Sequence, residues 1–170
     1  MNVSEVLPHE AGDSEQHLSF RIRQARYALP IALVREIIEY GQVTAVPMMP
    51  DFIHGVINLR GNVVPVLDLA ARFGFETTQA SKRTCIVIIE LELNGNAQEQ
   101  RIGLVVDAVD AVLDIDPRDV EQAPPFGTGI RTDFIAGMAR DEGGFTIILD
   151  VRRVLSLDDI RQLSLMQQAG

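Results

Sequence analysis

The chain is 170 residues long and 46% hydrophobic, which suffices for one globular domain with a substantial core. Its net charge of -9 would on average repel a phosphate backbone, so nucleic acid is not an expected partner. The longest strictly apolar run is Cys85–Ile89, which is too short to cross a bilayer, so direct membrane insertion is not expected. Cys85 is the only cysteine, so no intramolecular disulfide can form, and we expect a buried structural thiol.

The first 16 residues are polar and acidic and show no signal-peptide pattern, so we expect a flexible tail on a cytosolic protein. The remainder, residues 17–170, is expected to form a single domain. Short runs of Val, Ile and Leu, cut by Gly, Pro, Asn and Asp, predict strands at 18–22, 27–30, 43–46, 56–59, 63–67, 84–93, 101–106, 112–115, 135–139 and 145–149. Short helical turns are expected at 50–54 and 69–73, and a C-terminal helix at 157–166.

The sequence contains an internal repeat, because Phe52-Ile53-His54-Gly55 matches Phe134-Ile135-Ala136-Gly137 at an offset that also aligns Leu67 with Leu149 and Asp68 with Asp150. We therefore predict two related all-β subdomains. The first would span about residues 17–75, with contributions from the C-terminal segment, and the second about residues 83–155. Gly61-Asn62 lies between two predicted strands and is expected to form a tight turn.

Asp68 and Asp150 each follow a predicted strand and precede a short helical stretch, so helix capping is the favoured interpretation. The alternative is a carboxylate pair in a cleft between the two barrels, which would make the protein a small-molecule sensor or a hydrolase. The flanking sequences Leu-Asp-Leu and Leu-Asp-Val do not resemble an aspartic-protease site, so no catalytic residue is assigned. His9, His17 and His54 lack zinc-site spacing, so no metal is expected.

Arg60 lies at the mouth of a predicted hairpin, in the run Asn58-Leu59-Arg60-Gly61-Asn62. An arginine at such a tip should be exposed, and its guanidinium is suited to binding the carboxylates of a partner. From composition alone, a binding residue and an ordinary solvated charge are equally good interpretations.

The stretch Phe52–Leu69 resembles the signature of CheW domains, whose pattern is F-I-x-G-x-x-N-L-R-G-x-x-x-P-x-x-D-L, and it meets every fixed position. Further segments are similar to the same family, including its V-x-E-I element; these are 27–29, 34–37, 103–107, 134–137 and 148–151. The resemblance covers about residues 17–156.

This resemblance implies an all-β fold of two tandem five-stranded SH3-like barrels that share a hydrophobic core, with short helices. It implies a non-enzymatic adaptor without a cofactor. Such an adaptor links the cytoplasmic tips of chemoreceptors (methyl-accepting chemotaxis proteins) to the regulatory domain of a CheA-type histidine kinase. The protein would then be cytoplasmic and recruited to membrane-associated receptor arrays.

The resemblance also implies a receptor-binding groove that takes an amphipathic helix. Arg60 is the arginine of the N-L-R-G motif, while Val34 and Glu36 belong to the V-x-E-I element. The full set of groove residues implied in this way is Val34, Glu36, Gly55, Asn58, Arg60, Gly61, Val105, Val106 and Val109. No motif marks the surface that would contact the kinase.

Overall fold

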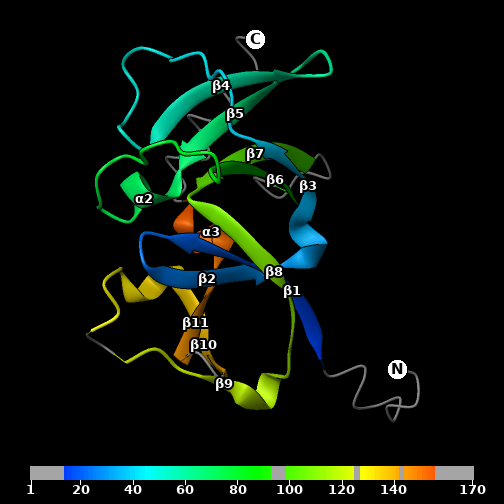
Figure 1. Cartoon of the computed structure of the whole chain (residues 1–170), viewed down its shortest axis with the longest axis vertical. Coiled ribbons are helices and arrows are strands. Elements are labelled where there is room, and N and C mark those ends of the chain that lie inside the picture. The colour runs from blue at the N-terminus through cyan, green and yellow to red at the C-terminus, as the bar shows by residue number, and fades with distance from the viewer. Residues whose placement is uncertain (1–13, 93–98, 125–126, 142–143, 156–170) are drawn as a thin grey trace.

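The computed structural model describes residues 14–92, 99–124, 127–141 and 144–155, and strands dominate it (Figure 1). The first of its two sheets has the strand order β8-β1-β2-β11-β10-β9, formed by β1 (Glu15–Ile22), β2 (Ala25–Pro30), β8 (Ala108–Ile115), β9 (Val120–Glu121), β10 (Ile135–Asp141) and β11 (Gly144–Leu149). The second has the order β3-β6-β7-β5-β4, formed by β3 (Val34–Glu39), β4 (Ile53–Leu59), β5 (Asn62–Asp68), β6 (Cys85–Glu92) and β7 (Glu99–Val106).

The helical elements in the described ranges are all short. They are the α-helices α2 (Leu69–Arg72) and α3 (Val151–Val154) and the 3-10 turns η2 (Ile31–Leu33), η3 (Pro117–Asp119) and η4 (Thr132–Phe134). The predicted all-β class with two sheets is therefore confirmed. The first sheet has one strand more than expected, because the two-residue β9 pairs with β10.

The internal repeat is visible as a repeated unit of two strands and a helix, since β4, β5 and α2 correspond to β10, β11 and α3. Both units have a register shift at the start of their first strand, between Ile53 and Gly55 in one and between Ile135 and Gly137 in the other. Each unit then adds a parallel strand, β7 beside β5 and β2 beside β11.

The sheets divide the chain differently from the predicted subdomains of about 17–75 and about 83–155, although the C-terminal segment does join the first strands, as expected for the first subdomain. The first sheet joins β1 and β2 to β8–β11, and the second joins β3–β5 to β6 and β7, so each half of the chain contributes to both sheets. The cause lies in two short crossings. Only η2 separates β2 from β3, and only Asp107 separates β7 from β8. The strand after the β1–β2 hairpin and the strand after the β6–β7 hairpin therefore enter the opposite sheet (Figure 1).

One cluster of buried side chains is shared by both sheets, as predicted. Residues of β1, β2 and β11 pack in it against residues of β4–β7 and both α-helices. A row of aromatic rings runs through this cluster: Phe20, Tyr27, Phe73 and Phe134 follow one another with centroid separations of 6.2, 5.3 and 6.0 Å. Such separations suit offset or tilted ring packing, so the row contributes directional contacts as well as buried apolar area.

The two repeated aspartates cap helices, which confirms the favoured interpretation. Asp68 is 0% exposed, and its carboxylate accepts hydrogen bonds from the Ala70 N–H at 3.0 Å and from both the N–H and the hydroxyl of Thr78 at 2.8 Å. Asp150 accepts from the N–H of Arg153 at 3.3 Å. The Asp68 carboxylate thus also holds the loop after α2 in place, and both of its oxygens already accept hydrogen bonds.

Several boundaries differ from prediction. β1 begins at Glu15, inside the predicted tail of residues 1–16, because Glu15 already pairs with Ile115 of β8. The strand expected at 43–46 is reduced to a single bridge between Thr44 and Val56. The expected C-terminal helix at 157–166, like residues 1–13, lies outside the described residues. Cys85 is half-buried rather than buried. In the described ranges, no helix is long and apolar enough to cross a membrane.

Gly55 allows the segment before β4 to lie directly on that strand. Its φ is +152°, and a Cβ built on it would lie 2.1 Å from the backbone oxygen of Thr44. The same close approach lets Thr44 exchange two backbone hydrogen bonds with Val56, at 2.9 and 2.8 Å. Because the obstructing atom belongs to the backbone, a side chain at position 55 cannot be accommodated by a rotamer change.

We expect Gly55→Ala to lower the free energy of unfolding by about 2–4 kcal/mol, because it combines overpacking with an unfavourable φ. Gly41→Ala is the matched control, since nothing lies within 4 Å of a Cβ at that position. Urea denaturation of both variants measures the difference. Equal stability of the two variants would show that the Thr44 segment can move away from β4 without cost.

Candidate protein-binding site

Arg60 occupies the tip of the β4–β5 hairpin, as the sequence predicts. Leu59 pairs with Asn62, so the two-residue turn is Arg60-Gly61, one position earlier than the expected Gly61-Asn62. Both turn residues have positive φ, +54° for Arg60 and +86° for Gly61, as the tight turn that matches strand twist requires. The side chain of Asn58 supports the turn by accepting a hydrogen bond from the Gly61 N–H at 3.0 Å.

The guanidinium of Arg60 is held by Glu36 in a two-point contact. Nη1 donates to Oε1 and Nη2 donates to Oε2, each at 2.7 Å. The side chain of Arg60 is 67% exposed and that of Glu36 is 27% exposed, so solvent screens the pair and its contribution to stability is small. The main effect of the ion pair is therefore to fix the orientation of an accessible guanidinium.

This ion pair spans the open side of the second sheet, because Glu36 lies on β3 and Arg60 follows β4, the two outermost strands. A second polar contact crosses the same side: the Tyr40 hydroxyl and Nε2 of His54 are 2.6 Å apart. Together with the Thr44–Val56 bridge, these contacts close the sheet into a barrel. His54 therefore serves barrel closure, and among the described residues no cluster of three potential metal ligands occurs.

Neighbouring charges keep Glu36 ionised. The hydrogen bond from Arg60 is the largest influence and holds the pKa of the Glu36 carboxyl below its ordinary value, although partial desolvation opposes it. Arg101 and Arg35 lower the same pKa further through their charges. These two arginines also approach Glu90 on β6, at 3.0 and 3.7 Å, so the ion pair borders a larger charged surface.

Two of the predicted groove residues do not reach the surface. Val105 is 1% exposed and Val106 is 0% exposed, because β7 lies inside the second sheet and is covered on both faces. Val105 packs in the small cluster of the second barrel, whereas Val106 packs in the shared core. The expectation that these two side chains line a binding surface is therefore corrected: they support the site from within.

The remaining predicted residues divide between the site and its surroundings. Val34 is half-buried on β3 next to Glu36, and Val109 is half-buried on β8 of the other sheet; both pack against the shared core. Gly55 is buried, so it acts through the close approach of Thr44 rather than through partner contact. The structure brings Glu36, Asn58, Arg60 and Gly61 together directly.

Sequence reasoning missed the Tyr40–His54 contact and the exposed apolar side chain of Ile37. Ile37 is 41% exposed on β3, immediately after Glu36. Glu36 pairs with Ile88 and Ile37 with Val87, so the two side chains lie on opposite faces of the strand, and Ile37 adds an apolar patch to the face that does not carry the ion pair. The sequence carried no clear signal for it, because the run Val34–Glu39 does not alternate between apolar and polar residues.

A two-barrel β protein with an oriented, accessible guanidinium at a hairpin tip has the features of a protein-binding scaffold. Comparison with known proteins identifies the family to which this scaffold belongs. The profile of the family described as "CheW-like domain" matches residues 16–159. The chain therefore belongs to the CheW-like domain family, and its general role is that of a chemotaxis scaffold.

Individual relatives agree with this assignment. The chemotaxis protein CheW of Klebsiella aerogenes is 30% identical over 158 residues, which cover 93% of this chain and 90% of that protein. CheW of Bacillus subtilis is 30% identical over 147 residues, covering 86% and 90%. The crystal structure of the scaffolding protein TtCheW from Thermoanaerobacter tengcongensis superimposes with a TM-score of 0.75 at 35% identity, covering 86% of this chain and 90% of that one.

We expect Arg60→Gln to raise the pKa of Glu36, because the largest interaction that lowers it is removed while Arg101 and Arg35 remain. In the native protein the ion pair is present at neutral pH and is lost only as the pH falls through the lowered pKa of Glu36. An NMR titration of the Glu36 carboxyl measures the change. Arg131→Gln is the control; it should raise the pKa of its own partner Asp133 and leave Glu36 unchanged.

Proposed function

We propose that this protein couples the cytoplasmic tips of chemoreceptors to a CheA-type histidine kinase, as a non-enzymatic adaptor. The observation that carries this proposal is the accessible Arg60 guanidinium, which Glu36 orients within the motif that is most characteristic of the family. Family membership and the similarity to a scaffolding protein support it.

The receptor contact would be a helix packed across the surface around β3 and the β4–β5 hairpin. Val34 and Ile37 supply apolar area on one face of β3, and Arg60, held by Glu36 on the other face, supplies a charge fixed in position, so the helix would lie along the β3 edge of the sheet. A helix with apolar side chains at i, i+3 and i+4 and one acidic side chain would match both the apolar area and the charge of Arg60. Because Glu36 uses only two of the five N–H donors of Arg60, the guanidinium can accept a second carboxylate without releasing the first.

In this mechanism the protein changes kinase activity through binding alone. It would be cytoplasmic and would reach the membrane only as part of a receptor array. The hydrolase alternative is not proposed, because Asp68 is fully buried and its carboxylate already accepts several hydrogen bonds from α2 and Thr78.

The test is co-sedimentation of the full chain with a CheA-type kinase and receptor signalling-tip fragments, together with kinase autophosphorylation. We expect the native chain to form a ternary complex and to stimulate the kinase. Arg60→Glu should weaken receptor binding by at least about tenfold, because a repulsive charge replaces a central attractive one. Arg131→Glu is the matched control, since Arg131 is also exposed and also paired with a carboxylate through two contacts.

A double variant separates direct contact from a purely structural role of the ion pair. Glu36→Arg combined with Arg60→Glu can restore the pair with its polarity reversed. We expect receptor binding to stay weak, because the exposed tip then carries a carboxylate. Full recovery would mean that the partner does not touch Arg60, and binding of neither the kinase nor the receptor by the native chain would overturn the coupling function itself.

A further inference from the structure

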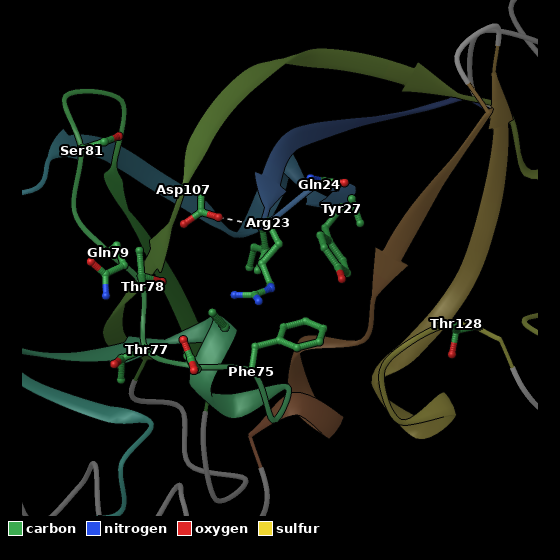
Figure 2. Close-up of a pocket in the computed structure, with 14 residues that line it drawn as sticks. Arg23, Gln24, Tyr27, Phe75, Thr77, Thr78, Gln79, Ser81, Asp107 and Thr128 are labelled. Atoms are coloured by element: carbon green, nitrogen blue, oxygen red, sulfur yellow. Dashed lines mark hydrogen bonds between the residues drawn. The ribbon is translucent and has the colours of Figure 1, made fainter.

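A cleft of about 820 Å³ opens between the two sheets, on a part of the surface that includes none of the predicted groove residues (Figure 2). Its walls come from the turn between β1 and β2, from the loop after α2 and from the crossing residue between β7 and β8. The residues that line it include Arg23, Tyr27, Phe75, Glu76, Thr78 and Asp107. Its volume falls within the range of small-ligand sites.

The floor of the cleft holds a polar atom without a partner. Tyr27 is 2% exposed, and its ring packs between Phe20 and Phe73 in the shared core. Its hydroxyl nevertheless belongs to the cleft lining and, within the described ranges, has no hydrogen-bond partner. Burial raises the pKa of this phenol, so it stays protonated and available as a donor. The hydroxyl opens into the cleft (Figure 2), so a molecule that enters the cleft can accept its hydrogen bond.

A cation lines the same cleft. Arg23 forms the tip of the β1–β2 turn with a φ of +58°, and its backbone N–H donates to Oδ2 of Asp107 at 2.5 Å. Its guanidinium carbon lies 5.3 Å from the ring centroid of Phe75 and points into the cleft (Figure 2). In the part of the chain that the structure describes, this guanidinium has no carboxylate partner.

The loop after α2, which forms the opposite wall, is held in place by internal hydrogen bonds before any ligand binds. Thr78 is bound to the buried carboxylate of Asp68 through its N–H and its hydroxyl, both at 2.8 Å. Further along the same loop, the N–H of Ser81 donates to the Thr84 hydroxyl at 2.8 Å. A wall that is already ordered loses little conformational entropy when a ligand binds.

We propose that this cleft binds a ligand carboxylate, held by the Arg23 guanidinium and the Tyr27 hydroxyl. Two acidic residues, Glu76 and Asp107, also line the cleft, so the ligand should carry an N–H donor close to its carboxylate. A free amino acid has this chemistry, and so does an acidic side chain within a peptide. The inference is independent of the proposed coupling function, because none of these residues belongs to the receptor groove.

The experiment is an NMR titration of the full chain with two probes, L-glutamate and a terminally blocked peptide that contains one glutamate. We expect one or both to shift the amide signals of residues 22–25, 75–79 and 107. Arg23→Gln and Tyr27→Phe should each weaken that binding by about tenfold or more, because each removes a hydrogen bond to a charged group. Arg140→Gln removes an exposed arginine that does not line the cleft, and it should leave binding unchanged.

The two probes distinguish the source of the carboxylate. Binding of glutamate supports a free amino acid, whereas binding of the peptide alone supports an acidic segment of a partner. If neither probe shifts these signals, or if both variants bind like the native chain, the proposal is overturned.

Thermal unfolding without a probe gives a second check. Tyr27→Phe should leave the melting temperature unchanged, because its hydroxyl has no internal bond to lose, whereas Tyr40→Phe should lower it by removing the contact with His54. A fall in the melting temperature of Tyr27→Phe would show an internal partner and overturn the role of this hydroxyl.

Discussion

Burial of the shared core requires both halves of the chain at once, because each sheet is assembled from strands of both. The crossings at η2 and Asp107 are too short to let either half fold back into a barrel of its own. Tyr27 lies at the centre of this arrangement, since its ring joins the aromatic row while its hydroxyl reaches the surface cleft. The relative position of the two barrels, and thus of every surface between them, follows from this packing.

The second barrel depends less on apolar burial than the shared core does. In the described ranges its own cluster contains five buried side chains, and its open side is closed by polar contacts: Arg60–Glu36, Tyr40–His54 and the Thr44–Val56 bridge. Of these contacts, the exposed Arg60–Glu36 ion pair contributes little free energy but fixes the orientation of its guanidinium. The charge with the most firmly fixed orientation is therefore held by an ion pair that contributes little to the free energy of unfolding.

Sequence alone predicted the all-β class, the repeat, the capping by Asp68 and the exposed Arg60. It missed β3, because the register shift between Val34 and Glu36 and the adjacent charges interrupt the expected alternation. It misplaced Val105, because an apolar run does not reveal that an internal strand is covered on both faces. The exchange of strands was not predictable, since a repeat is equally compatible with separate and with interleaved barrels; only tertiary pairing distinguishes them.

The exchange also constrains how the chain can fold during synthesis. The hairpin of β1 and β2 finds its outer neighbours only in β8 and β11, and Ser19, for example, pairs with Ala111. Until the ribosome has made those distant strands, both edges of the hairpin remain without a partner. Pairings so far apart in sequence require the chain to close a large loop, at a cost in conformational entropy, before the stabilising strand contacts can form. This slows folding and leaves strand edges exposed to aggregation. Exposure of both edges of this hairpin during synthesis is thus a direct consequence of interleaving the barrels.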